Sequence, residues 1–220
     1  MDNNKLILFS NIKGGVGKTT LTECFAHYLV MKGEPVVVVD ADIQQTLAHD
    51  VKTDKELLPD TPQPWQCLTL DTLDPEQAVN IIEQLKQVPG WVLVDCPGNL
   101  QDPSLVSLFK AADVIVTPIA FDRKSLDGTS TFVQVLIRLK VGAKIVFVPN
   151  RIVTTENNAE YQARRNEAKQ VLSQFGKITA RIKQSVIFNR LNTLKPLDRY
   201  QYNAVEHACD DIMNVVNGEQ

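Results

Sequence analysis

The residues best suited to chemistry in this sequence lie in one glycine-rich stretch near its start. Residues 11–20 read Asn-Ile-Lys-Gly-Gly-Val-Gly-Lys-Thr-Thr. The glycines allow successive backbone N–H groups to turn toward one point without Cβ clashes. The ammonium of Lys18 can reach the β- and γ-phosphates of a nucleotide, and the Thr19 hydroxyl can ligate Mg²⁺. This stretch therefore predicts a phosphate-binding loop, or P-loop.

The sequence around the loop supplies the elements that such a loop needs. An apolar run at residues 6–9 precedes it and indicates a buried strand. A helical pattern follows from Lys18, with apolar residues at helical spacing: Leu21, Cys24, Phe25, Tyr28 and Leu29. The order strand, glycine-rich turn, helix places the helix N-terminus, with its unpaired N–H donors, beside the bound anion.

One position departs from the ordinary P-loop pattern. Ile12 stands where that pattern has its first glycine, and a second lysine, Lys13, precedes Gly14 and Gly15. This arrangement is the deviant Walker A motif, and the chain resembles the ParA/MinD family of ATPases. The resemblance implies that Lys13 contacts phosphate across a nucleotide-sandwiched homodimer. The alternative is a solvated loop lysine.

Three carboxylates follow apolar runs that predict strands. Asp40 and Asp42 follow residues 36–39, and Asp95 follows residues 91–94. Parallel strands end at one sheet edge, so these groups are expected beside the P-loop. The resemblance implies that Asp42 orients the attacking water, that Asp40 supports the water shell of the metal, and that Asp95 is a Walker B residue contacting Mg²⁺ through water. Alternatively, Asp40 and Asp42 cap the following helix; Ile43 replaces a proline that is frequent in the family.

Two residues after a later strand complete the candidate site. Asn150 and Arg151 follow residues 144–148 and resemble the base-contacting position of the family, although a simple strand-end turn is the alternative. Asp122 and Gly128 match a looser family pattern, for dimer contacts or structure. The predicted catalytic residues are Lys13, Lys18 and Asp42, and the metal residues are Thr19, Asp40 and Asp95. The predicted ATP-binding residues are Gly14, Gly15, Val16, Gly17, Lys18, Thr19, Thr20, Asn150 and Arg151.

Composition narrows the class of protein. The 220 residues are 44% hydrophobic and 22% charged, which is ordinary for a globular protein with a sizeable core. No apolar run reaches membrane-spanning length, and the first residues lack the apolar core of a signal peptide. Four cysteines lie far apart, which predicts reduced thiols in a cytoplasmic protein and argues against a zinc or iron–sulfur site.

Predicted strands alternate with predicted helices along the whole chain. The strands are expected at residues 6–10, 36–39, 66–70, 91–94, 114–116, 144–148 and, as a short strand, 179–182. The helices are expected from residue 18, within 44–64, and at 75–87, 104–110, 124–140, 159–175 and 201–216. Such alternation predicts βαβ units with right-handed crossovers. We expect one doubly wound α/β domain of the P-loop NTPase type over residues 1–220, with a mostly parallel sheet and helices on both faces.

Charge is distributed unevenly. Residues 164–199 contain nine basic and two acidic residues, a balance of +7 that leaves −10 for the rest of a chain whose total is −3. Clustered positive charge suits sequence-independent contact with DNA phosphates, and the resemblance supports that interpretation. An ordinary solvated surface is the alternative. The candidate DNA contacts are Arg164, Arg165, Lys169, Lys183 and Arg190.

The last predicted helix argues against membrane attachment. Membrane-associated members of the family end in a basic amphipathic helix. Here no Lys or Arg follows Arg199, whereas Glu206, Asp210, Asp211 and Glu219 do. Anionic lipid would repel such an acidic end.

The resemblance is strongest to short ParA-type DNA partition ATPases. It implies plasmid or chromosome segregation in which Mg²⁺-ATP drives dimerisation and nonspecific DNA binding, and slow hydrolysis resets both. Because the P-loop begins at residue 11, we expect no preceding DNA-binding domain, so a separate small centromere-binding or adaptor protein would supply specificity. We also expect nucleoid association in the ATP-bound state.

Three alternatives remain open. A ParA-like ATPase can act in conjugative transfer or cargo positioning with the same chemistry. A metabolic P-loop ligase, such as a dethiobiotin-synthetase-like enzyme, would need neither Lys13 nor a basic flank. A nitrogenase-iron-protein-like reductase would need cysteines placed for an intersubunit cluster, which Cys96 alone does not provide.

Overall fold

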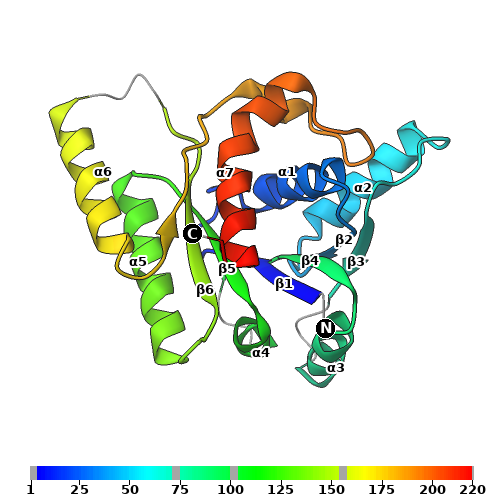
Figure 1. Cartoon of the computed structure of the whole chain (residues 1–220), viewed down its shortest axis with the longest axis horizontal. Helices are drawn as coiled ribbons and strands as arrows, with labels where there is room; N and C mark the ends of the chain where they lie inside the picture. Colours follow the sequence, from blue (N-terminus) through cyan, green and yellow to red (C-terminus); the bar gives the residue numbers. More distant parts are fainter. Residues whose placement is uncertain (1–3, 71–74, 100–103, 154–157, 220) are drawn as a thin grey trace.

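The strands form one twisted sheet at the centre of the molecule (Figure 1). The computed structural model describes residues 4–70, 75–99, 104–153 and 158–219. Within these ranges seven strands pair in the order β3-β2-β4-β1-β5-β6-β7, and every pairing is parallel. The strands are β1 (Asn4–Phe9), β2 (Val36–Asp40), β3 (Gln66–Thr69), β4 (Gly90–Asp95), β5 (Val114–Ile119), β6 (Lys144–Pro149) and β7 (Lys177–Ile178).

Helices cover both faces of this sheet (Figure 1). In sequence order they are α1 (Lys18–Met31), α2 (Thr46–Leu57), α3 (Pro75–Leu85), α4 (Ser104–Ala111), α5 (Arg123–Arg138), α6 (Ala159–Leu172), the 3₁₀ helix η1 (Val186–Arg190) and α7 (Arg199–Asn217). Along β1, Ile7 and Phe9 pack toward α1 and α7, whereas Leu6 and Leu8 pack toward α3, α4 and α5. The predicted doubly wound α/β fold is confirmed. In the described part of the chain, no helix is both long and apolar enough to span a membrane.

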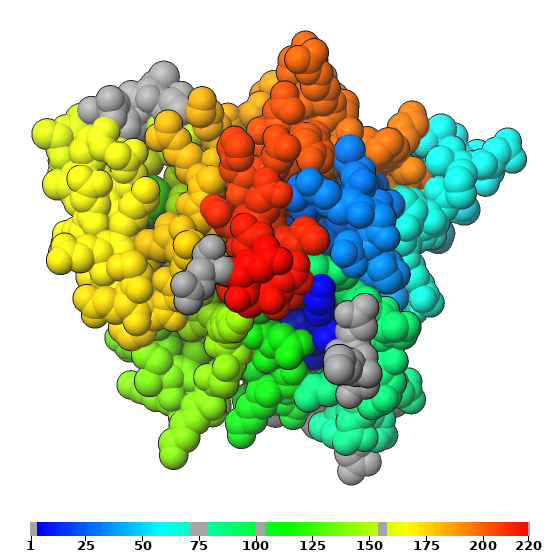
Figure 2. All heavy atoms as spheres, in the orientation of Figure 1, coloured from blue at the N-terminus to red at the C-terminus, as the bar shows by residue number. Residues whose placement is uncertain are grey.

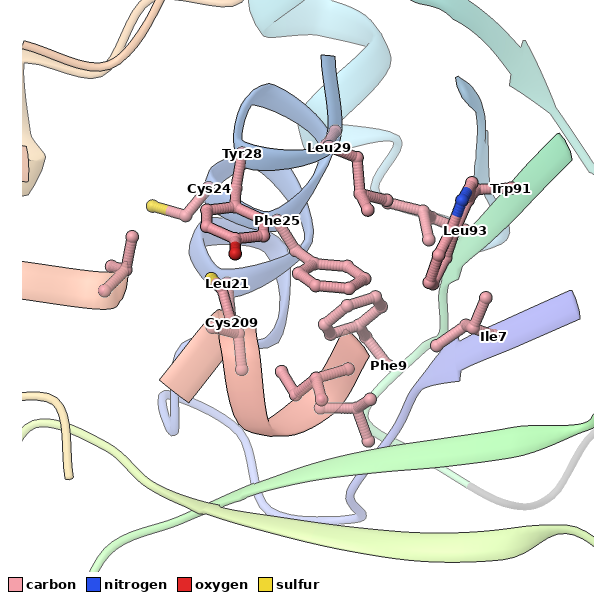
Figure 3. Close-up of a cluster of buried hydrophobic side chains, with 14 of the residues drawn as sticks. Ile7, Phe9, Leu21, Cys24, Phe25, Tyr28, Leu29, Trp91, Leu93 and Cys209 are labelled. Atoms are coloured by element: carbon pink, nitrogen blue, oxygen red, sulfur yellow. The ribbon is translucent and has the colours of Figure 1, made fainter. Parts of the chain in front are cut away.

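Aromatic packing anchors α1, the helix that begins at the P-loop. Its Phe25 ring lies 5.9 Å from the ring of Phe9 in β1 and 5.9 Å from that of Trp91 in β4 (Figure 3). The rings of Phe25 and Tyr28 stack at 6.1 Å. Buried aromatic pairs contribute beyond their area, about 0.5–1.5 kcal/mol each. Because these contacts fix α1 on β1 and β4, they also fix the end of the P-loop.

The expected strand at residues 179–182 was wrong in position. Pairing with β6 begins earlier, at Lys177–Ile178, because Gly176 lets the backbone approach β6; a Cβ there would lie 2.2 Å from the Ile145 carbonyl oxygen. The chain then bulges and pairs again at an isolated bridge between Lys183 and Ile152. The sequence also did not predict η1.

Strand β5 is longer than expected. It runs to Ile119 through Pro118, although the apolar run predicted an end at residue 116. Pro118 lacks the N–H that a ladder needs. It is tolerated because the pairing of β5 with β1 stops at Val116, so this part of β5 has a paired neighbour only in β6.

A cluster of ionisable groups lies between α1 and α2. Glu23 is 6% exposed, and its Oε1 has no hydrogen-bond partner among the described residues. Burial, followed by the charges of Asp50 and Asp54, raises the pKa of Glu23 to about 8. One turn along α1, burial lowers the pKa of His27 to about 4, which leaves it neutral at pH 7. Glu23 therefore retains its proton in the folded state near neutral pH.

We expect Glu23 to make stability depend on pH. Its pKa is higher in the folded than in the unfolded chain, so its contribution is fully present below about pH 4.5 and is lost as pH rises toward about 8. Urea unfolding should show that Glu23→Gln lies within about 1 kcal/mol of the parent near pH 5 and exceeds it by about 4 kcal/mol at pH 8.5. The control is Glu56→Gln, an exposed glutamate on α2. Parallel pH profiles for parent and Glu23→Gln would contradict the assignment.

Candidate nucleotide site

The loop between β1 and α1 has the conformation that glycine permits. Gly15 and Gly17 have φ values of +76° and +89°, which residues with a Cβ rarely adopt. A Cβ on Gly17 would also lie 2.5 Å from Nδ2 of Asn150. Helix α1 begins at Lys18 without a side-chain cap, so the N–H groups of its first turn are available to an anion. The predicted order of strand, loop and helix is confirmed.

Lys18 and Thr19 connect the loop to the end of β4. The Lys18 side chain is 9% exposed, and its Nζ lies 3.6 Å from the position that a Cβ on Gly98 would occupy. The Thr19 hydroxyl donates a hydrogen bond to Oδ2 of Asp95 at 2.6 Å. The two side chains predicted to contact phosphate and Mg²⁺ thus lie beside the Walker B position.

Asp95 has the surroundings of a carboxylate that serves a cation. It is 1% exposed, and its Oδ1 has no hydrogen-bond partner among the described residues. Burial and the nearby charge of Asp40 raise the pKa of Asp95 to about 7. The hydrogen bond from Thr19 and the charge of Lys18 act in the opposite direction and lower this pKa in part. A buried carboxylate oxygen without a donor is costly unless a ligand or water supplies one. This oxygen and the Thr19 hydroxyl therefore fit a hydrated Mg²⁺.

The two carboxylates at the end of β2 differ in exposure. Asp40 is fully buried, and its oxygens accept the backbone N–H groups of Asp42 (3.1 Å) and Ala48 (3.0 Å). Burial raises the pKa of Asp40, and these hydrogen bonds partly offset the rise. Asp42 is half-buried and accepts the N–H of Gln44 at 3.0 Å. Asp40 thus holds the start of α2 in place, as the capping alternative predicted. The residues that follow are more exposed: Asp42 is half-buried, and Ile43 is 56% exposed.

Lys13 lies against α5. Its Cβ is 3.3 Å from the position that a Cβ on Gly128 would take, so this helical glycine makes room for the lysine. Burial raises the pKa of Asp122, but hydrogen bonds from Ser125 and the charge of Lys13 bring the net value below the usual range. Asp122 and Gly128, matched only loosely in the sequence, therefore surround Lys13.

Beside the loop lies a cleft of about 590 Å³. It extends from Gly17 and Thr20 to η1, and Asn150 and Arg151 form part of its wall. Its other lining residues come from α1, the segment after β7 and α7: Leu21, Cys24, Ile182, Lys183, Gln184, Ser185, Val186, Phe188, Asn189 and Val205. The cleft adjoins the P-loop where the nucleoside of a bound nucleotide would lie.

The predicted DNA-contact residues differ in their surroundings. Arg164 is ion-paired with Glu160 at 2.6 Å, and Arg190 with Asp198 at 3.0 Å. Lys183 lines the cleft.

A separate cationic cluster lies where α6 meets the segment after β7; the two form one flank of the molecule (Figure 2). Burial, followed by the charges of Arg165 and Arg181, lowers the pKa of Lys169. We call Arg165, Lys169 and Arg181 the α6 cluster. Arg181 was missed as a candidate because its proximity to α6 depends on the course of the chain after β7.

Comparison with known proteins defines the class. The CobQ/CobB/MinD/ParA nucleotide binding domain family matches residues 7–197. The chain belongs to this family, the ParA/MinD family of ATPases, as the motifs predicted.

Individual relatives agree with this assignment. The chromosome-partitioning ATPase Soj of Treponema pallidum is 24% identical over 201 residues, 78% of this chain and 79% of its own length. The septum site-determining protein MinD of Synechocystis is 29% identical over 143 residues, 52% of this chain and 54% of its own length. The chain thus spans about half the length of that MinD.

The fold itself has close counterparts. A plasmid partition protein from Borrelia burgdorferi B31, in a structure with bound AMPPNP, superposes with a TM-score of 0.76. The match covers 96% of this chain and 99% of that protein, at 14% sequence identity. At this identity the match shows the shared fold alone.

Proposed function

We propose that this protein is a Mg²⁺-dependent ATPase of DNA partition. ATP binding drives sandwich dimerisation and nonspecific DNA binding, and slow hydrolysis resets both. The observation that carries the proposal is the hydrogen bond from Thr19 to Asp95 beside a glycine loop already in its anion-binding conformation. The family supports ATP as the nucleotide.

The residues divide the chemistry among them. Lys18 offsets charge on the β- and γ-phosphates, and Thr19 with Asp95 holds the hydrated metal. The more exposed Asp42 orients a water in line with the γ-phosphate, while the buried Asp40 fixes the loop that carries Asp42. Asn150 and Arg151 line the cleft that receives the nucleoside.

Dimerisation depends on Lys13. A partner copy facing the P-loop would place its own nucleotide opposite Lys13. Lys13 then contacts a phosphate of the nucleotide bound to the partner. The contact with Gly128 of α5 positions Lys13 at the edge of the nucleotide site. A metabolic ligase would have no use for this second lysine, and this observation favours the partition ATPase over that alternative.

Replacing Asp42 should keep the protein in its ATP-bound dimer, because ATP still binds but the attacking water is no longer positioned. Asp42→Ala retains Lys18 and Thr19, so it should bind ATP but hydrolyse it at least tenfold more slowly, consistent with removal of a water-positioning group. Sedimentation at tens of micromolar protein should show a dimer with ATP and a monomer with ADP. Asp60→Ala, at an exposed aspartate, is the control. An Asp42→Ala protein that binds ATP and stays monomeric would refute the dimer mechanism.

The α6 cluster is the surface that binds DNA in this proposal. Its cations, Arg165, Lys169 and Arg181, have no ion-pair partner within 4 Å among the described residues, so they are available to phosphates. Arg164 and Arg190, in contrast, are ion-paired. Two such clusters on one dimer would make the second DNA contact effectively intramolecular, so ATP would switch DNA binding without touching DNA. Specific sites, by this proposal, are read by a separate small adaptor protein, and the ATP-bound dimer is nucleoid-associated in the cytoplasm.

Paired double variants test this surface. Arg165→Gln with Lys169→Gln removes four cations from each dimer, so it should weaken binding to unrelated duplexes by about tenfold or more and reduce the salt slope by about 4. Arg164→Gln with Arg190→Gln makes the same charge change at paired arginines and should have a smaller effect. Fluorescence anisotropy with ATP, ADP and no nucleotide provides the readout. Binding that ignores nucleotide state, or equal losses in both doubles, would contradict this mechanism.

Conjugative transfer and cargo positioning require the same chemistry and differ only in the cargo. The chain is also similar to the septum site-determining protein MinD, and a basic amphipathic helix is the device by which a protein of this kind would bind lipid. The last turn of α7 contains no basic residue, and this observation favours a DNA surface over a lipid surface.

A further inference from the structure

Strand β3 forms one edge of the sheet, and its outer side has no partner strand among the described residues. None of its four residues is buried, whereas all six residues of β4 are. The N–H of Leu70, which follows β3, donates a hydrogen bond to the Asp40 carbonyl oxygen of β2 at 2.9 Å. Because the backbone groups of successive strand residues point to opposite sides, those of Cys67 and Thr69 point to the open edge.

This edge lacks the features by which proteins usually protect an open strand. Its sequence, Gln-Cys-Leu-Thr, contains no proline and no charged residue, and no residue of β3 has a positive φ. The opposite edge differs, because β7 is two residues long and pairing resumes only at an isolated bridge. The β3 edge therefore offers unpaired backbone donors and acceptors to another strand.

A groove of about 330 Å³ lies between this edge strand and α2. Its lining residues are Ala48, Val51, Lys52, Lys55 and Glu56 of α2 and Cys67 of β3. Burial, followed by the charge of Asp40, raises the pKa of Cys67 to about 11, so its thiol is neutral near pH 7. A neutral thiol behaves as a small apolar group. Together with Ala48 and Val51, it makes part of the groove suitable for an aliphatic side chain.

The charged residues of the groove favour an acidic ligand. Lys52 is exposed and, among the described residues, has no ion-pair partner within 4 Å. Nζ of Lys55 donates a hydrogen bond to the Thr61 carbonyl oxygen at 3.1 Å. The two lysines outweigh the single Glu56. The end of α2 projects from the rest of the molecule, so this side of the groove is open to a partner (Figures 1 and 2).

We propose that the β3 edge and the α2 groove bind an extended segment of a partner protein, which adds a strand to the sheet. An aliphatic side chain of that segment enters the groove beside Cys67, and a carboxylate pairs with Lys52. In this mode of recognition main-chain hydrogen bonds supply affinity, and the groove supplies specificity for alternate side chains. The inference goes beyond the proposed ATPase function and does not depend on it.

A defined peptide tests this surface in the absence of nucleotide. The probe is a fluorescein-labelled peptide, Thr-Val-Thr-Glu-Thr-Val-Thr, which places valine and glutamate on one face of a strand. Fluorescence anisotropy should show that the parent binds it, and that a peptide with lysine in place of glutamate binds at least about threefold more weakly. No binding of either peptide at about 1 mM would overturn the inference.

Two substitutions at Thr69 isolate the backbone contribution. Thr69→Pro removes an outward N–H at an edge position, where proline is tolerated, and should weaken peptide binding by about tenfold. Thr69→Val retains the N–H and should stay within about twofold of the parent. Urea unfolding shows whether both variants are folded. If the folded Thr69→Pro protein binds the peptide as the parent does, no strand is added at this edge.

Charge reversal tests the groove independently of the strand. Lys52→Glu should reverse the preference, so that the lysine peptide binds more tightly than the glutamate peptide. Lys110→Glu, at an exposed lysine of α4, makes the same charge change elsewhere and should keep the preference of the parent. An unreversed preference in Lys52→Glu would contradict the proposed pairing, even where Thr69→Pro fails to fold. Nucleotide-free self-association of the parent that Thr69→Pro abolishes would identify a second copy of the chain as the occupant, and the proposed partner would be wrong.

Discussion

The parallel register of β2, β4 and β1 is the constraint on which the site depends. Asp40 of β2 pairs with Asp95 of β4, and Asp95 pairs with Phe9 of β1. The three strands consequently end at one level, and the P-loop that follows β1 begins beside both carboxylates. A shift of one residue in the β1–β4 pairing would separate Thr19 from Asp95, and the same shift in the β2–β4 pairing would separate Asp40 from Asp95. The paired ends of these strands, Phe9, Asp40 and Asp95, are all buried.

Burial also determines the electrostatics of the site. Asp40 and Asp95 lie next to each other in the sheet, where loss of hydration raises both pKa values. Lys18 and the Thr19 hydroxyl stabilise the charged form of Asp95 in part, and a divalent cation would complete that stabilisation. The site thus maintains a buried carboxylate whose negative charge a metal ion can offset. Asp42, which is more exposed, remains available to water.

The sequence could predict features that depend on neighbouring residues. Apolar runs followed by Asp40 and Asp95, and the spacing of the P-loop residues, predicted the doubly wound sheet and the placement of Thr19 near Asp95. Contacts between distant segments could not be predicted in this way. The Asn150 and Arg151 contacts with the loop, and the proximity of Arg181 to α6, depend on where β6 and β7 end. The shifted β7 had the same cause, since Gly176 permits a close approach to β6 that apolar periodicity does not report.

The proposed mechanism requires a phosphate site centred on Lys18 that the fold forms on its own. Calorimetric titration of ATP with Mg²⁺ into the parent and into Lys18→Ala tests it most directly. We expect one site per chain for the parent and a loss of at least tenfold in affinity for the variant, because a buried charge-assisted contact to phosphate disappears. Equal affinity in the two proteins would show that the nucleotide binds elsewhere and that Lys18 does not form the phosphate site.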